Sequence, residues 1–336
     1  MLPHGQNFTL KMKKVAIGVD IGGTNTAIGV VDEAGNVMVK ENIPTPAHGD
    51  IDKYIADLSA AINELIKSVK LINEDAEVTG IGIGAPNGNY YTGSIEYAPN
   101  LSFKGAVHLV KLLRNYFPVI QVIALTNDAN AAAIGEMIYG GAKGMKNFVM
   151  FTLGTGIGSG IVVNGELVYG SDGFAGEIGH TSLVPDGRPC GCSALGHLEA
   201  YCSASGMKRT AFELLAHYNA NDSLLADKTY RELDSKMIFD AAEKGDKIAL
   251  EVFEKTGSWL GLALADTVHY LSPEAIFLFG GPTAAGDFIF KPTKEAMEKN
   301  LLPIYKNKIK ILPSKLKPGD AAIVGASALV WKEVEK

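Results

Sequence analysis

The sequence predicts an α/β protein built from two related domains, and three observations lead to this fold class. A strand, a glycine turn, a second strand and a hairpin turn follow one another at 15–36 and return in the same order at 148–165. Segments with the apolar spacing of helices lie between the two copies and after the second. The 336 residues, 47% of them hydrophobic, are enough to bury two cores. We therefore expect two α/β domains, each offering one glycine turn to a cleft between them.

The first copy begins with an apolar strand at 15–20, a tight turn at 21–26 and a second apolar strand at 27–31. Residues 33–36 then close a hairpin. A helix is predicted at 52–70 because its apolar residues recur every three or four positions along one face. The elements that follow it are predicted as a strand at 79–85, a helix at 107–116, a strand at 120–125 and a helix at 129–137.

The second copy has strands at 148–153 and 159–163, joined by a glycine turn at 154–158. Asn164-Gly165 closes it with a strong hairpin signal. An irregular segment, 170–196, comes next. The last elements are predicted as helices near 198–218, at 235–243 and at 247–270, a strand at 275–279, a helix at 292–300, a strand at 309–312 and a helix from Asp320.

The order of these elements predicts the domain boundaries. We expect a flexible leader at 1–14, a small α/β domain at 15–126 plus 320–336, and a larger α/β domain at 127–319. The leader lacks the 7–15-residue apolar stretch of a secretory signal.

Composition excludes several classes of partner. The 31 Lys plus Arg against 37 Asp plus Glu give a net charge of −6, so no basic field attracts nucleic acid. Apolar runs fall short of the roughly 20 residues that cross a bilayer, so no membrane partner is expected. The three cysteines are too few and too clustered for a disulfide framework, which favours a reducing compartment. We expect a cytoplasmic protein.

Both glycine turns have the chemistry of phosphate-binding loops. In the first, Asp20 ends a strand and precedes Gly22, Gly23 and Thr24, so backbone amides can approach phosphate oxygens while the carboxylate holds Mg²⁺. An ordinary hairpin turn explains this motif alone equally well. Neither turn has the context of a dinucleotide-binding G-x-G-x-x-G or of a G-x-x-x-x-G-K-[ST] loop. Two such turns in duplicated hairpins favour a phosphate clamp.

Three shorter segments are candidates for substrate contacts. Asn127 and Asp128 lie where a buried strand ends and a helix begins, so Asp128 is placed for general-base catalysis, although helix capping is the commoner role of either residue alone. Gly280-Gly281 follows an apolar strand and would let a flat base lie against the backbone, or would simply turn the chain. Turns at 84–88 and 98–101 carry Asn side chains that can bond a sugar.

A cluster of sulfur and nitrogen ligands occupies the irregular segment. His180, Cys190, Cys192 and His197 offer two imidazoles and two thiolates, a set suited to tetrahedral zinc. Their spacing is not that of the common Cys-x-x-Cys knuckle, and buried thiols with loop histidines are the alternative. Cys202 lies outside the spacing and is predicted to be a core thiol.

Five motifs in this order resemble the ROK family, the repressors and sugar kinases of the actin-like ATPase fold. They lie at 20–26, 127–130, 153–158, 177–180 and 190–192, within a match that covers residues 15 to about 330. The resemblance implies a two-domain actin-like ATPase (ribonuclease H-like) fold that closes on a hexose and ATP, and a homodimer. It also implies ATP-dependent phosphorylation of the hexose 6-hydroxyl, of glucokinase type, with Mg²⁺ at the phosphates and a structural Zn²⁺.

The resemblance assigns a role to each matching residue. Asp128 corresponds to the catalytic base. The sugar ligands correspond to Asn127, Glu177, His180, Glu199 and, less specifically, Asn100. The nucleotide motifs correspond to Asp20, Gly22, Gly23 and Thr24, to Thr152, Gly154, Thr155 and Gly156, and to Gly280 and Gly281. His180 would bind zinc through one ring nitrogen and a sugar hydroxyl through the other. The chain departs from the family at His197, where a third cysteine is usual, and imidazole still binds zinc.

Two competing functions have different signatures. A sugar-responsive repressor of this family carries an added N-terminal helix-turn-helix domain, and about 14 residues before the first strand are too few for one. A kinase for N-acetylglucosamine or N-acetylmannosamine would share the same chemistry. The distinction rests on loops at 84–101 and 170–174, which the sequence does not resolve.

Overall fold

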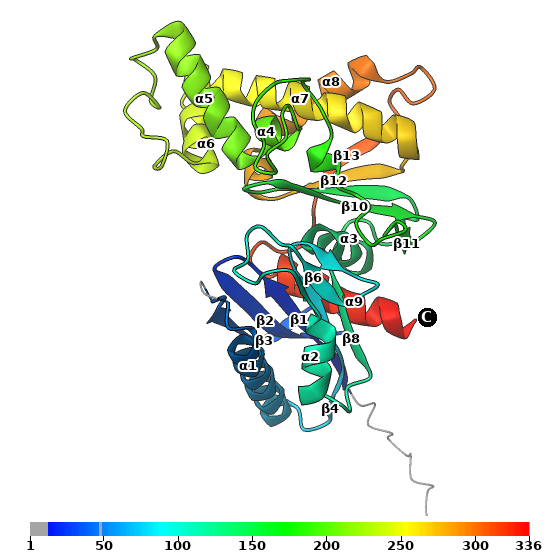
Figure 1. The fold of residues 1–336 in the computed structure, drawn as a ribbon. Helices are drawn as coiled ribbons and strands as arrows, with labels where there is room; N and C mark the ends of the chain where they lie inside the picture. The colour runs from blue at the N-terminus through cyan, green and yellow to red at the C-terminus, as the bar shows by residue number, and fades with distance from the viewer. Residues whose placement is uncertain (1–12, 47–48, 336) are drawn as a thin grey trace, which may run out of the picture. The chain divides into compact units, whose positions relative to one another are not determined.

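The computed structural model describes residues 13–46 and 49–335, which form two compact α/β units (Figure 1). Unit 1 contains the chain up to Tyr139 and again from Leu316, and unit 2 contains Gly140–Lys315. Most of the predicted leader lies outside the described residues. Its last two residues, Lys13 and Lys14, are an exception to the prediction because they already belong to the first strand. Among the described residues, no helix has both the length and the apolar character needed to span a membrane.

Unit 1 is built on a five-stranded sheet with the order β3-β2-β1-β4-β8. The first three strands pair antiparallel, whereas β1, β4 and β8 run parallel. The strands are β1 (Lys13–Ile21), β2 (Asn25–Asp32), β3 (Val37–Pro44), β4 (Ala76–Gly84) and β8 (Val122–Thr126). A parallel connection between β1, β4 and β8 puts their carboxyl ends at one edge of the sheet.

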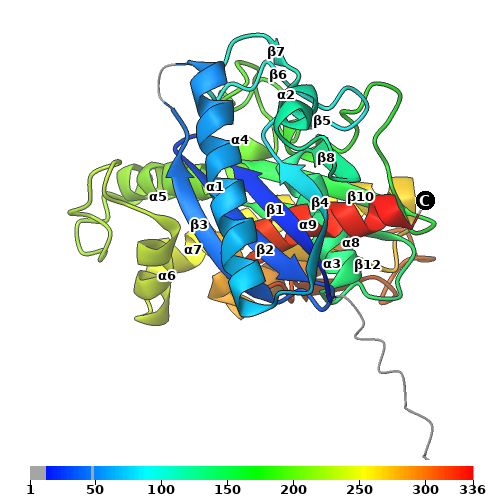
Figure 2. The ribbon, with the colours of Figure 1, turned by 90° about the horizontal axis from the view of Figure 1, so that it is seen from below.

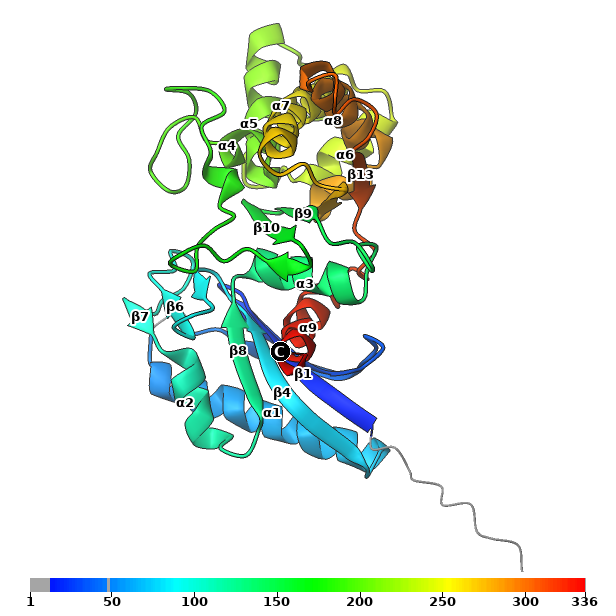
Figure 3. The same ribbon diagram turned by 90° about the vertical axis from the view of Figure 1, so that its right-hand side faces the viewer.

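Helices cover both faces of this sheet. Helix α1 (Ile51–Ile72) lies across one face (Figure 2), together with α2 (Leu109–Tyr116). Helix α9 (Ala321–Val334) packs on the other face, and α3 (Asp128–Ile138) packs on α9 (Figure 3). The face of α1 predicted to be apolar is the face that packs into the core.

Helix α3 requires a correction to the predicted domain boundary. The boundary after residue 126 assigns α3 to the second domain, whereas the structure places it in unit 1. The cause is close helix packing: a Cβ on Gly135 of α3 would lie 2.8 Å from the Cα of Gly325 in α9. Two glycines at one crossing let the helix backbones touch, which local sequence patterns do not reveal.

Unit 2 repeats the topology of unit 1, as the predicted duplication requires. Its sheet has the order β11-β10-β9-β12-β13, with β9 antiparallel to β10 and parallel to β12, and β12 parallel to β13. The strands are β9 (Phe148–Leu153), β10 (Ile157–Val163), β11 (Glu166–Leu167), β12 (Ala275–Phe279) and β13 (Lys310–Pro313). The helices are α4 (Glu199–Cys202), α5 (Ala204–Tyr218), α6 (Ser235–Glu243), α7 (Lys247–Leu271) and α8 (Asp287–Asn300).

Several elements differ from the prediction. Helix α8 begins at Asp287 rather than at the predicted Pro292, which lies inside the helix. The single helix predicted near 198–218 is two helices separated by Ser203, whose hydroxyl caps α5 through the Gly206 amide. The region 84–101, described above as loops, includes two strands of a small sheet of β5 (Gly88–Asn89), β6 (Ser94–Glu96) and β7 (Ala106–Val107). The irregular segment 170–196 contains only the short 3-10 helix η1 (Ile178–His180).

Candidate functional site

Two carboxylates meet at the carboxyl edge of the unit 1 sheet. Asp20 pairs in register with Gly84 of β4, and Gly84 with Thr126 of β8, so the three parallel strands end side by side. Asp128 begins α3 directly after β8. A Cβ added to Gly84 would lie 3.7 Å from the Asp128 Cα, which shows how closely α3 approaches this edge. The carboxyl ends of parallel strands are the usual ligand-binding edge of such sheets.

The environment of these carboxylates raises both of their pKa values. Burial and the neighbouring Asp128 charge raise the pKa of Asp20 to about 6. The side chain of Asp128 reaches solvent, yet protein surrounds most of it, and this desolvation raises its pKa against the opposing effect of the Ala129 amide. A carboxylate with a raised pKa is a stronger proton acceptor than an ordinary one.

Asn127 takes the capping role that was the alternative for this segment. Its Oδ1 accepts a hydrogen bond from the Ala129 amide at 2.8 Å, and the residue has the extended conformation of an N-cap. Asp128 Oδ1 accepts from the same amide at 2.7 Å. Asn127 therefore orients α3, and its amide nitrogen is left to donate to a ligand.

The first glycine turn lies against the loop that carries Asn100. A Cβ on Gly23 would lie 2.7 Å from the Asn100 carbonyl oxygen, so only glycine lets this loop approach so closely. The turn is closed by a hydrogen bond from the Gly22 amide to the Asn25 carbonyl at 3.0 Å. The structure thus brings together Asp20, the glycine turn, Asn100, Asn127 and Asp128 within unit 1.

The hydroxyl groups of Thr26, Thr45 and Tyr54 form a buried network beside this turn that was not predicted from the sequence. Thr26 lies 2.7 Å from the Tyr54 hydroxyl and 2.8 Å from the Thr45 hydroxyl, and the Thr45 amide donates to the Thr24 carbonyl. Burial raises the pKa of Tyr54 to about 12, with a smaller contribution from Asp20. Tyr54 sits on the apolar face of α1, so periodicity alone marks it as a core residue.

In unit 2 the second glycine turn contacts one of the predicted sugar ligands. Glu199 Oε2 accepts a hydrogen bond from the Ile157 amide at 3.0 Å. A Cβ on Gly156 would lie only 2.3 Å from that oxygen. The turn itself is closed by the Gly154 amide and the Gly156 carbonyl at 2.9 Å. Glu199 is therefore coupled to the backbone of the phosphate-binding candidate.

Gly280 lies beside the same turn. It has a φ of 116°, which favours glycine, and a Cβ there would lie 2.1 Å from the Leu153 carbonyl oxygen. Phe279 pairs with Thr152, so β9 and β12 end together. The structure brings together Thr152, Gly154, Thr155 and Gly156 of the β9–β10 turn with Gly280 and Gly281.

The predicted metal ligands converge in the irregular segment. The ligand atoms of His180, Cys190, Cys192 and His197 all lie within 4.8 Å of one another. Ligand atoms around tetrahedral zinc are separated by roughly 3.5 Å, which follows from bond lengths of about 2.0–2.3 Å. The two sulfur and two nitrogen donors therefore fit a zinc ion with small adjustments. Cys202 lies outside this cluster, fully buried, with its thiol 3.5 Å from the Thr256 carbonyl oxygen, as predicted for a core thiol.

The two nitrogens of His180 face different groups. Nδ1 lies 3.8 Å from the Cys190 sulfur, on the side of the metal ligands. Nε2 lies 3.9 Å from Glu177 Oε2, and both side chains are partly exposed. The ring therefore lies between the metal ligands and an accessible carboxylate.

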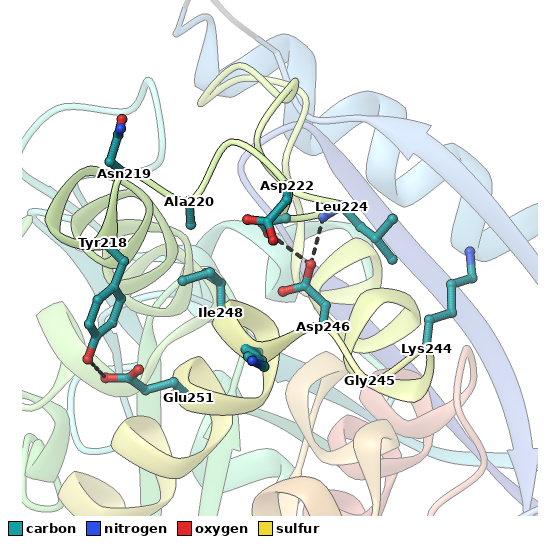
Figure 4. Close-up of a pocket in the computed structure, with 12 residues that line it drawn as sticks. Tyr218, Asn219, Ala220, Asp222, Leu224, Lys244, Gly245, Asp246, Ile248 and Glu251 are labelled. Carbon is teal, nitrogen blue, oxygen red and sulfur yellow. Dashed lines mark hydrogen bonds between the residues drawn. The ribbon is translucent and has the colours of Figure 1, made fainter.

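A cavity of about 610 Å³ lies elsewhere in unit 2 and contains none of the predicted site residues (Figure 4). Asp246 at its centre is the N-cap of α7 and accepts hydrogen bonds from the Ala249 amide, the Leu224 amide and the Ser223 hydroxyl. These bonds satisfy a helix terminus and tie a loop to it. The cavity lies between helices, and the residues that line it form no arrangement suited to catalysis.

The two units define a class of protein. Each combines the same mixed sheet with a glycine turn at the carboxyl edge, the construction of the actin-like ATPase fold. Residues 16–333 match the sequence profile of the ROK family, and the chain belongs to that family.

Named relatives and solved structures share most of the chain. It is 35% identical to a glucokinase of Halalkalibacterium halodurans over 94% of this chain and 95% of that protein. It is 31% identical to a glucokinase of Thermotoga maritima over 95% and 98% of the two chains. A ROK family glucokinase from Streptomyces griseus, crystallised with glucose and AMPPNP, is 31% identical with a TM-score of 0.77, covering 95% of this chain and 99% of that one.

Proposed function

We propose that this protein is an ATP-dependent hexose kinase that phosphorylates the sugar 6-hydroxyl, with Asp128 as the general base. The placement of Asp128 beside Asp20, at the carboxyl edge of the sheet and with a raised pKa, carries the proposal. The similarity to glucokinases, one of them crystallised with glucose and an ATP analogue, supports it.

In the proposed reaction Asp128 accepts the hydroxyl proton while the sugar oxygen forms a bond to the γ-phosphorus. The bond between that phosphorus and the β,γ-bridging oxygen breaks, and ADP leaves. Positioning and charge neutralisation contribute most of the rate enhancement in this chemistry. Asp20 would hold Mg²⁺, which neutralises phosphate charge when bound.

The remaining residues bind and orient the two substrates. The proposed sugar ligands are Asn100, Asn127, Glu177, His180 and Glu199. The proposed nucleotide contacts are backbone amides and hydroxyls of Gly22, Gly23, Thr24, Thr152, Gly154, Thr155 and Gly156, with Gly280 and Gly281 against the adenosine. Oriented substrates also keep water from taking the phosphoryl group.

The activity is tested by coupled ADP release with MgATP and a panel of sugars, each against a blank without sugar. The panel contains glucose, mannose, fructose, N-acetylglucosamine and N-acetylmannosamine. We expect turnover with glucose above all, and preferential turnover with an N-acetylated sugar would redirect the substrate assignment. Silence across the panel from folded protein would overturn the kinase proposal. We also propose that the protein is cytoplasmic and forms a homodimer. Size-exclusion chromatography with light scattering tests the dimer.

Zinc is proposed as a structural ion held by His180, Cys190, Cys192 and His197. We expect about one zinc per chain by elemental analysis of protein purified without chelator, and Cys192→Ser should remove most of it because a hydroxyl is a poor zinc ligand. Cys202→Ser, which changes a thiol outside the cluster, is the matched control and should retain the metal. Zinc-free protein after such a purification would contradict this assignment.

The acid limb of the pH profile should reflect the raised pKa values. A general base works only when deprotonated, so kcat/KM should fall as the pH drops through the pKa of Asp128. Asp20 would lose its charge as the pH falls through its pKa of about 6, which would weaken Mg²⁺ binding. We expect the fall to begin well above the ordinary range of aspartate. A profile that stays flat from pH 7 to pH 4.5, with the fold intact by circular dichroism, would contradict the assigned base.

A further inference from the structure

One arginine with an extensive set of contacts has no role in the reaction described above. The side chain of Arg188 is only 11% exposed. Its Nη1 donates to the carbonyl oxygens of Ala200 at 3.2 Å and Gly206 at 3.4 Å, and to the Thr210 hydroxyl at 3.0 Å. Its Nε donates to Glu213 at 3.0 Å, and Nη2 donates to the other oxygen of the same carboxylate.

Aromatic rings and backbone bonds hold the rest of Arg188. The guanidinium carbon lies 4.6 Å from the ring centre of Tyr201 and 5.2 Å from that of Trp259, both within cation–π distance. The Arg188 amide donates to the Tyr201 hydroxyl at 2.8 Å, and its carbonyl accepts from the Gly196 amide at 2.8 Å. A planar guanidinium packed against two adjoining rings and bonded along its edge has a single position.

The contacts of Arg188 join two parts of the candidate site. Cys190, a proposed zinc ligand, follows Arg188 by two residues, and Ala200 directly follows Glu199, a proposed sugar ligand. Helix α4 has only four residues, too few to satisfy its own terminal carbonyls, and Arg188 supplies a donor to one of them. The Cys190 sulfur also lies 3.4 Å from Glu199 Oε1.

We propose that Arg188 is a positioning residue that fixes Glu199 for sugar binding and Cys190 for metal binding. It fastens the irregular loop to α4 and α5 at a point that needs no metal, so the loop has two independent attachments. The inference rests on the proposed roles of Glu199 and Cys190. Loss of Arg188 should weaken the binding of sugar and zinc far more than the binding of nucleotide. A general stabilising role would not make this distinction.

The test compares Arg188→Met with Glu213→Gln. Methionine keeps the apolar stem but loses every side-chain donor, whereas Glu213→Gln removes the charge and one acceptor oxygen of a carboxylate that is 59% exposed and keeps the Arg188 donors to Ala200, Gly206 and Thr210. We measure KM for glucose, KM for ATP, and zinc release to a coloured chelator. We expect Arg188→Met to raise the glucose KM and the zinc release rate about tenfold or more, and the ATP KM less than about threefold. Glu213→Gln should stay near wild type in all three.

Arg188→Met with a wild-type glucose KM and zinc release would overturn the proposal, as would an equal rise in both KM values. If this variant fails to fold, Arg188→Lys replaces it and should show the same pattern at smaller amplitude; its absence counts against the proposal. If the wild type phosphorylates no hexose, the kinase proposal fails and zinc release alone decides the role of Arg188. If the wild type holds no zinc, the glucose KM alone decides the role of Arg188. If the wild type neither phosphorylates a hexose nor holds zinc, the proposed roles of Glu199 and Cys190 fail, and the proposal for Arg188 fails with them.

Discussion

Asp128→Asn is expected to lower kcat by about a thousandfold, because the amide has the shape of the carboxylate but cannot take the proton from the sugar hydroxyl. The side-chain oxygen of asparagine still accepts the Ala129 amide, so the start of α3 should keep its geometry. Removing one of two neighbouring acids also relieves their repulsion. Folding stability should therefore not fall, and glucose affinity should change little.

Steady-state kinetics and glucose binding by calorimetry would separate catalysis from binding. Asp246→Asn is a suitable control, since Asp246 also lies at the start of a helix, where it caps the helix and holds a loop outside the candidate site, and asparagine caps a helix about equally well. The control should keep wild-type kcat. Near-full turnover by Asp128→Asn with normal sugar binding would assign the base to another residue.

The sequence predicts elements well where their local signals are strong. Strands β9 and β12 and helix α6 have the predicted bounds, because short apolar runs ended by glycines and an aspartate before an amphipathic segment are local features. Only the start of α8 was predicted wrongly, because Pro292 lies inside the helix and packs against α7, where a Cβ on Gly257 would lie 2.6 Å from it. Strands β5 to β7 are too short to show a period.

In the candidate site, too, residues close in sequence were predictable and those brought together by tertiary packing were not. His180, Cys190, Cys192 and His197 lie close in sequence, so their convergence was predictable from spacing and donor type. The approach of Asp128 to Asp20 depends on parallel pairing of three strands across about a hundred residues, and the repeated glycine turns gave only an indirect signal for it. Tyr54 and Arg188 were missed because their partners are hydroxyls, carbonyls and rings that form no motif.

Gly156→Ala is expected to raise the glucose KM about tenfold or more while leaving the fold intact. The new Cβ would lie 2.3 Å from Glu199 Oε2, and the end of a flexible side chain can move away where a backbone atom could not. Moving it breaks the bond between Glu199 and the Ile157 amide. A charge-assisted hydrogen bond of this kind contributes about 1.5–3 kcal/mol, which corresponds to roughly a ten- to hundredfold change in affinity.

Gly154→Ala is the matched control, because a Cβ there meets nothing closer than the Gly156 carbonyl oxygen at 4.0 Å. Both variants add one methyl group to the same turn, so both perturb the nucleotide contacts of its backbone amides to a similar extent. Only Gly156→Ala displaces the proposed sugar ligand. We therefore expect the KM for glucose, and not the KM for ATP, to separate the two variants. Equal glucose KM values would mean that Glu199 does not bind the sugar from this position, and its bond to the Ile157 amide would then serve only to order the turn.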